Sequence, residues 1–145
     1  MYIIVFALVL AVLFLFMIII GQVSKSLPVV ELRPSLIHGR GMFATRQINT
    51  GHVIEIVPII QINRDKDITE DSVIRNYDIR FGDNHAIMLG YGAIYNHSDN
   101  NNAYWQFMGD QLYIIAKNII AKNEEVCVSY GEDYWAPRND KVDSA

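Results

Sequence analysis

The sequence predicts a mainly β domain that follows one N-terminal transmembrane helix. The first 20 of the 145 residues carry no charge, whereas all 12 Lys and Arg and all 16 Asp and Glu come after them. The rest of the chain holds several short β-rich runs separated by turn residues, a spacing typical of a β domain. We therefore expect an anchor at residues 1–21, a linker at 22–28, one globular domain at 29–135 and a polar tail at 136–145.

The N-terminal run is long enough to cross a bilayer. Residues 3–20 are apolar without interruption and would span ~27 Å as a helix, close to the ~30 Å hydrocarbon core. A cleaved signal peptide is the alternative, but it would need a basic stretch before a shorter apolar run of ~7–15 residues. Lys25, Arg33 and Arg40 follow the run and no basic residue precedes it. The positive-inside tendency therefore predicts a single-pass membrane protein whose domain faces the cytoplasm.

The first half of the domain reads as short strands joined by glycine turns. Residues 29–33 favour a strand that ends at Pro34, because proline cannot donate to a sheet ladder. The glycines within residues 38–41 and 49–51 indicate turns, with a short extended run at residues 42–45 between them.

The second half alternates polar loops with further strands. Residues 53–62 favour one long strand, with an edge or a bulge at Pro58, and residues 63–84 read as a charged insert with one helical turn. The remaining elements that we expect are an apolar, glycine-punctuated segment at 86–95, a polar loop at 99–102 and two short strands at 112–116 and 126–130.

Charge and cysteine content exclude several functions. The formal net charge is -4, and no two Lys or Arg are adjacent, so binding to nucleic acid phosphates is disfavoured. Cys127 is the single cysteine and cannot form an internal disulfide. No C-x-x-C or H-x-x-x-H spacing occurs, so no local zinc site is indicated.

The glycine pair at Gly39 and Gly41 begins a G-x-G-x-x-A pattern that could be mistaken for a dinucleotide fingerprint. That fingerprint needs a buried strand before it and a helix after it. Here Pro34 lies just upstream, and a turn at Gly51 follows too soon for a helix. Taken alone, the two glycines predict a tight turn.

Three segments taken together change that interpretation. They are Gly39-Arg40-Gly41-Met42-Phe43-Ala44-Thr45-Arg46, Asn96-His97-Ser98-Asp99-Asn100-Asn101-Asn102 and Glu124-Glu125-Val126-Cys127-Val128-Ser129-Tyr130-Gly131. In this order they resemble the motifs of the SET-domain protein lysine methyltransferases, nearest to the minimal viral and bacterial members. The resemblance covers residues 29–135. It implies small curved β-sheets, a C-terminal pseudoknot, and a cofactor, S-adenosylmethionine, that enters from the face opposite the target lysine.

The resemblance also implies a role for each matched residue. Tyr130 would be the catalytic residue that aligns the methyl group with the amine. The cofactor would be bound by Gly39, Arg40, Gly41, Asn96, His97 and Trp135. Trp105 and Tyr134 would line the lysine channel, although core packing explains these two aromatic residues equally well.

Each of the other matched residues also has an ordinary structural interpretation. Asn96 and His97 could form an Asx-type turn beside a core histidine. Tyr130 could be a half-buried strand aromatic. No metal is expected, because Asp99 stands where many family members place a zinc-binding cysteine.

The expected function is therefore that of a membrane-anchored, S-adenosylmethionine-dependent protein lysine N-methyltransferase. A histone or another basic protein would be its substrate, because Glu124, Glu125, Glu132 and Asp133 would attract a basic peptide. One alternative is a catalytically inactive module of the same fold that binds basic peptides. Another is an anchored β domain that contacts a partner through its charged insert.

Overall fold

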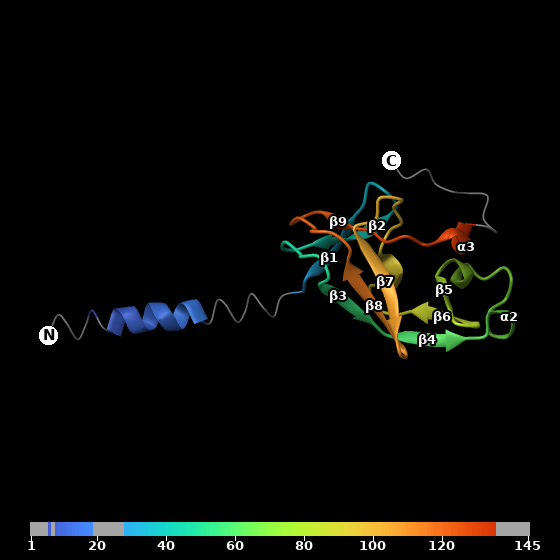
Figure 1. The fold of residues 1–145 in the computed structure, drawn as a ribbon, viewed down its shortest axis with the longest axis horizontal. Coiled ribbons are helices and arrows are strands. Elements are labelled where there is room, and N and C mark those ends of the chain that lie inside the picture. The colour runs from blue at the N-terminus through green and yellow to red at the C-terminus, as the bar shows by residue number, and fades with distance from the viewer. Residues whose placement is uncertain (1–5, 7, 19–27, 136–145) are drawn as a thin grey trace.

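The computed structural model describes residues 6, 8–18 and 28–135, and the domain in this part of the chain is mainly β. Three antiparallel sheets of three strands each make up the domain (Figure 1). The first sheet has the order β1 (Val30–Pro34), β2 (Arg40–Ala44), β9 (Glu125–Val126). The second has the order β3 (Val53–Val57), β8 (Gln111–Ala116), β7 (Ala103–Met108). The third has the order β4 (Ile59–Ile62), β6 (Asn84–Met88), β5 (Asp78–Phe81). The short helices are α2 (Arg64–Asp67), η1 (Val73–Asn76), η2 (Gly92–Ile94) and α3 (Glu132–Trp135).

The hydrophobic core is built from the inward faces of these strands. Along β7, Ala103, Trp105 and Phe107 are buried or half-buried while their neighbours are exposed, which is the period of two that a strand imposes. On β8, Leu112 and Ile114 are fully buried and pack with the rest of the core. The core therefore lies against the second sheet and fixes the register of its strands.

Pro58 divides the expected strand at residues 53–62 in two. β3 and β4 lie on either side of it and belong to different sheets. The carbonyl of Pro58 accepts the amide of Leu89 at 2.9 Å, but its ring nitrogen has no hydrogen to continue a ladder. The proline is therefore the corner at which the chain changes sheets, and the irregularity in pairing lies instead between Val53 and Glu55.

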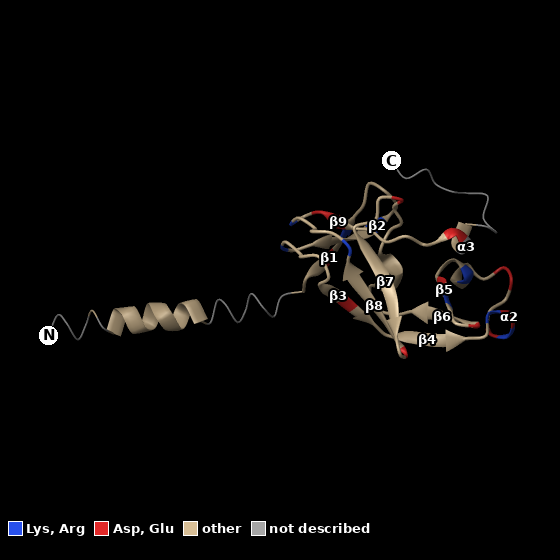
Figure 2. Ribbon diagram, viewed as in Figure 1, with Lys and Arg blue, Asp and Glu red and all other residues tan. Residues whose placement is uncertain are grey.

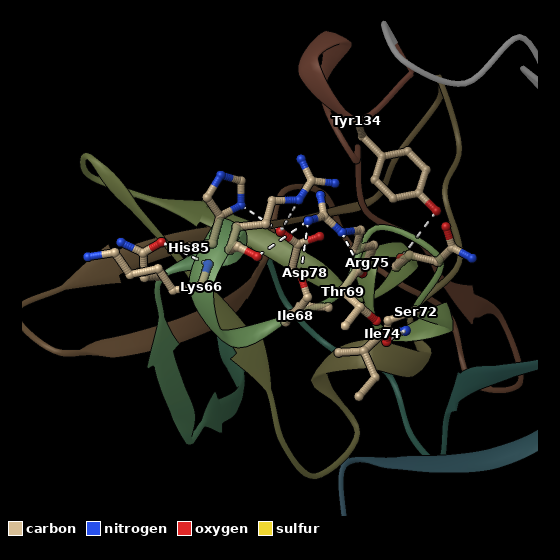
Figure 3. Close-up of polar contacts among 12 residues, drawn as sticks. Lys66, Ile68, Thr69, Ser72, Ile74, Arg75, Asp78, His85 and Tyr134 are labelled. Atoms are coloured by element: carbon tan, nitrogen blue, oxygen red, sulfur yellow. Dashed lines mark hydrogen bonds and ion pairs between the residues drawn. The ribbon is translucent and has the colours of Figure 1, made fainter.

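Residues 63–84 have more regular structure than the sequence indicated. They form α2, η1 and β5, and the guanidinium of Arg75 donates to the carbonyls of Thr69 at 2.8 Å and Ile68 at 3.0 Å (Figure 3). Strand β7 was not expected at all. The expected strand at residues 126–130 is confirmed only in its first residue, because β9 ends at Val126.

The C-terminal segment lies between β2 and the loop after η2. Val126 pairs with Met42 on one side. On the other side, the Val128 amide donates to the Asn96 carbonyl at 3.0 Å, and the Ala103 amide donates to the Cys127 carbonyl at 3.0 Å. The C-terminal segment is therefore held on both sides by stretches far apart in the chain, and the expected pseudoknot stays a prediction.

The structure describes only part of the expected anchor. Residues 6 and 8–18 are helical with exposed side chains, whereas residues 1–5, 7 and 19–27 lie outside the described residues. Of the helices that the structure describes, none combines the length and the apolar character needed to span a bilayer. The expected transmembrane helix is therefore not supported. The expected polar tail at 136–145 also lies outside the described residues.

Candidate active site

A tight loop between β1 and β2 forms one wall of the candidate site. The Ser35 amide donates to the Gly39 carbonyl at 3.1 Å, and the Ser35 hydroxyl accepts the Ile37 amide at 2.9 Å. Gly39 has a φ of +49°, a conformation that glycine adopts without steric cost. No atom lies within 4 Å of where a Cβ on Gly39 would stand. The space beside its backbone is therefore open, and binding of a cofactor there stays a prediction.

Gly41 is required for a different reason. A Cβ on Gly41 would lie 3.0 Å from Nδ2 of Asn96, 2.7 Å from Cδ of Glu125 and closer still to that residue's Oε1. The space is therefore filled by the protein's own side chains. Gly41 supports the loop from behind and does not line the pocket described below.

Asn96 ties this loop to the C-terminal strand. The residue is 6% exposed, and its Nδ2 lies 3.2 Å from the His38 carbonyl, 3.2 Å from the Arg40 carbonyl and 2.7 Å from Oε1 of Glu125. Oδ1 takes part in none of these contacts. Asn96 therefore shapes the loop and lines the pocket at the same time.

Glu124 and Glu125, two adjacent residues of the C-terminal segment, accept hydrogen bonds from other parts of the domain. Glu125 accepts the Ser35 hydroxyl at 2.8 Å on Oε2 and Asn96 on Oε1. Glu124 accepts Nδ2 of Asn102 at 2.8 Å and the Ala121 amide at 2.7 Å. All four carboxylate oxygens therefore accept hydrogen bonds within the domain, and the attraction of a basic peptide by Glu124 and Glu125 stays a prediction.

His97 fixes the backbone of the candidate catalytic residue. Its Nδ1 accepts the Tyr130 amide at 3.1 Å, so the ring proton sits on Nε2, which donates to Oδ1 of Asp99 at 3.1 Å. The imidazole is 8% exposed. His97 therefore acts as a buried positioning group, and its ring packs 5.3 Å from that of Tyr130.

The phenol of Tyr130 is aimed into the protein. Its hydroxyl donates to the Tyr95 carbonyl at 2.8 Å. Burial, reinforced by the neighbouring Tyr134, raises the pKa of Tyr130 above its usual range. The phenol therefore stays neutral near pH 7, where it can hold a hydrogen bond but cannot act as a phenolate base.

Four aromatic rings meet at this point. The ring centroid of Tyr130 lies 6.0 Å from Trp105, stacked on it, 4.8 Å from Tyr134 and 6.1 Å from Trp135. Trp105 lies on β7, and Tyr134 and Trp135 lie on α3. The hydroxyl of Tyr134 donates to the Asn76 carbonyl at 3.4 Å (Figure 3). The structure thus gathers the sequence-predicted aromatic residues around one tyrosine.

These residues line a pocket of about 1170 Å³. The sequence-predicted residues on its wall are Gly39, Arg40, Asn96, His97, Trp105, Tyr130, Tyr134 and Trp135. The volume lies slightly above the ~300–1,000 Å³ typical of small-molecule sites. Nε1 of Trp135 is buried without a hydrogen-bond partner among the described residues. An unused indole donor, an open glycine backbone and this volume fit a cofactor with polar and aromatic parts, as S-adenosylmethionine has.

The far end of the pocket carries an ionic cluster that sequence reasoning missed. Oδ2 of Asp78 lies 3.2 Å from Nε of Arg64 and 2.6 Å from Nδ1 of His85, and the Asp78 side chain is only 3% exposed (Figure 3). The three residues come from α2, β5 and β6. α2 follows β4, and β4 and β5 both pair with β6, so the third sheet as a whole brings the three residues together.

Three comparisons show which known proteins this chain is similar to. A family model described as the SET domain matches residues 39–131. The chain is 30% identical over 110 residues to a histone-lysine N-methyltransferase of Schizosaccharomyces pombe described as specific for H3 lysine-37. This alignment covers 72% of the chain and 75% of the relative. A crystal structure of a Plasmodium falciparum protein assigned as a histone methyltransferase superposes with a TM-score of 0.65 at 30% identity. That match covers 75% of this chain and 98% of the other.

Proposed function

Because this chain belongs to the SET-domain family, we propose that it transfers a methyl group from S-adenosylmethionine to lysine side chains of a histone or another basic protein. The family match and the fission yeast relative make the chain a protein-lysine N-methyltransferase. The observation that carries the proposal is the half-buried, neutral phenol of Tyr130, set among aromatic rings in a pocket that Gly39 and Asn96 also line.

The residues on the side of the pocket formed by the loop between β1 and β2, here called the loop side, suit the cofactor. When bound, S-adenosylmethionine supplies an electrophilic methyl group on a positively charged sulfur. The open backbone at Gly39 permits close approach, and the unused indole N–H of Trp135 is a donor for a polar atom of the ligand. Asn96 holds the loop in this shape through its contacts with the carbonyls of His38 and Arg40.

The aromatic side of the pocket suits the lysine. An unperturbed lysine amine has a pKa of ~10.4 and must lose its proton before it can attack carbon. Aromatic walls from Trp105, Tyr130 and Tyr134 exclude water, and desolvation lowers the pKa of an amine. The Tyr130 hydroxyl donates to a backbone carbonyl, so its oxygen keeps its lone pairs to align the amine. Holding reactants in line at ~3–3.5 Å supplies much of the rate of such a displacement.

The substrate class rests on the relatives and on the net charge. The fission yeast relative is described as acting on histone H3, a basic protein, and this chain has a formal net charge of -4. Acidic and basic positions are intermixed around α2 (Figure 2). Recognition of the peptide therefore relies on the pocket and its rim more than on a field of a single sign.

We also propose that the N-terminal run tethers the enzyme to a membrane with the domain in the cytoplasm. The support is the uncharged sequence of residues 1–20 and the exposed apolar side chains of residues 8–18. The full chain should float with lipid vesicles, and a chain lacking residues 1–21 should not. A protease added to intact cells should digest the domain only after the plasma membrane is permeabilised. Flotation without residues 1–21 would refute the tether.

Methyl transfer is tested with the full chain in a mild detergent. The chain is incubated with S-adenosylmethionine labelled in its methyl group and with purified core histones, beside Tyr130→Phe and the control Tyr104→Phe. The control removes the same hydroxyl from a tyrosine on the exposed face of β7. We expect Tyr130→Phe to lose ~10²–10³ in rate, the loss typical of removing one positioned hydrogen-bonding group from an active site, while Tyr104→Phe keeps the parent rate.

Calorimetry separates the remaining outcomes. Both variants should bind the cofactor as the parent does, because neither hydroxyl lies on the loop side of the pocket. A parent that binds both cofactor and histone peptides without transferring label would indicate the inactive peptide-binding module. Full activity in Tyr130→Phe would show that the phenol is not the aligning group.

A further inference from the structure

Glu55 is a half-buried carboxylate on β3 to which the proposed reaction assigns no role. Val53 pairs with Ile115 and Glu55 with Ile114, so β3 carries one extra residue between these two pairs. Such a bulge turns the following side chain away from the regular alternation, and bulges are frequent beside active sites. Here it turns Glu55 out of solvent, where a carboxylate would ordinarily lie.

The carboxylate holds the turn that precedes the Asn96 motif. Its Oε2 accepts the hydroxyl of Tyr95 at 2.9 Å, and its Oε1 accepts the amide of Tyr91 at 3.2 Å. Tyr95 is 1% exposed, so its hydroxyl depends on this acceptor. A Cβ on Gly90, which has a φ of +61°, would lie 3.1 Å from Oε1, so the turn is closed tightly around the carboxylate.

The same tyrosine contacts the reacting centre through its backbone. The Tyr95 carbonyl accepts the hydroxyl of Tyr130 at 2.8 Å. The side chain of Tyr95 is thus fixed from β3 while its carbonyl sets the direction of the Tyr130 O–H bond. Burial and the neighbouring Glu55 raise the pKa of Tyr95, so its phenol stays protonated and donates to the carboxylate.

We propose that Glu55 is a positioning residue for methyl transfer, acting through Tyr95 to hold the hydroxyl of Tyr130 in its productive direction. This inference rests on the proposed function of Tyr130. It predicts that loss of the Glu55 carboxylate lets the Tyr95 segment shift and turns the Tyr130 hydroxyl away from the amine. Misplacement of about 1 Å at a reacting centre can lower the rate ~10²-fold.

The test compares Glu55→Ala and Glu55→Gln in the full chain with a matched control, Asp110→Asn. Asp110 is an exposed carboxylate in the turn that joins β7 to β8 of the same sheet. We expect Glu55→Ala to lower kcat ~10- to 100-fold with little change in the cofactor Kd. Glu55→Gln, which keeps an acceptor oxygen, should recover part of this loss, and Asp110→Asn should match the parent.

A double-mutant cycle separates positioning from general destabilisation. If Glu55 acts through the Tyr130 hydroxyl, Glu55→Ala should cost little further kcat once Tyr130→Phe is present. A merely structural role would instead lower the unfolding temperature and leave kcat unchanged well below it, which would overturn the proposal. Equal losses of kcat in both backgrounds would overturn it as well.

A spectroscopic measurement keeps this inference distinct from the proposed function. The 13C ring signal of Tyr130, assigned with Tyr130→Phe, should shift in Glu55→Ala and stay in place in Asp110→Asn, whether or not the parent transfers methyl groups. An inactive parent would refute the proposed function alone. An unshifted Tyr130 signal in Glu55→Ala would refute the positioning role alone.

Discussion

Gly41→Ala should be far more damaging than its small size suggests. The added methyl group would occupy the place of the Glu125 carboxylate, whose oxygens accept from Asn96 at 2.7 Å and from Ser35 at 2.8 Å. Hydrogen bonds to a charged group contribute ~1.5–3 kcal/mol each. Glu125 is half-buried and can partly rehydrate when displaced, so we expect a loss of about 2–4 kcal/mol in the free energy of unfolding.

Thermal unfolding of the full chain measures this loss. At ~4 °C per kcal/mol for a domain of this size, the Tm should fall by ~8–16 °C. The cofactor Kd should also rise, because the loop that contains Gly39 would move with Glu125.

The comparison variant is Gly39→Ala. The methyl group added at residue 39 would meet no atom within 4 Å, but the residue has a positive φ. This substitution should therefore lower the free energy of unfolding by only ~1 kcal/mol. In the double variant Gly41→Ala/Glu125→Ala the collision with Glu125 is absent and only the 3.0 Å contact with Nδ2 of Asn96 remains, so its cost should fall well below the sum of the two single changes. A Gly41→Ala protein as stable as Gly39→Ala, or a strictly additive double variant, would refute the steric argument.

Three further predictions concern the segments around the site. Asn102→Ala should destabilise the domain by ~2–3 kcal/mol in urea titrations, because it leaves the Cys127 amide and the Glu125 carbonyl without their side-chain partner; an unchanged midpoint would contradict this. Burial raises the pKa of Cys127 to about 12. The folded protein should therefore react with iodoacetamide near pH 8 ~10³-fold more slowly than the unfolded chain. Equal rates would show that the thiol is accessible. Burial also raises the pKa of Glu55 above 4.5. Its contribution to stability should therefore be complete below that pH and be lost as the pH rises through the folded-state pKa. Glu55→Gln should remove this part of the pH dependence of unfolding, and a profile identical to that of the parent would refute it.

Local sequence patterns predicted most of the strands because the cause of each is local. The apolar residues of β1 and β8 mark these strands locally, and the glycines mark the turns at Gly39 and Gly51, where both residues have a positive φ. Strand β7 was missed although Ala103, Trp105 and Phe107 alternate as a strand requires.

The assignment of Pro58 shows where local patterns stop. A proline in an apolar run indicates an interruption, but the sequence does not say whether the chain kinks within one sheet or leaves it. The departure into the third sheet depends on the pairing of β4 with β6, which is a long-range choice. The ionic cluster around Asp78 depends on that same sheet and was therefore not predictable.

By itself, the sequence determined the motifs, the uncharged N-terminal run and the family, because all of these depend on the order of residue types. Only the tertiary structure decided what each motif residue does. Gly39 and Gly41 look alike in sequence, yet one supplies a backbone conformation and the other leaves room for Glu125 from the far end of the domain. Glu55 became part of the site through a bulge in β3. The physical reason is that excluded volume and hydrogen-bond partners are set by strand register, which joins residues that the sequence keeps far apart.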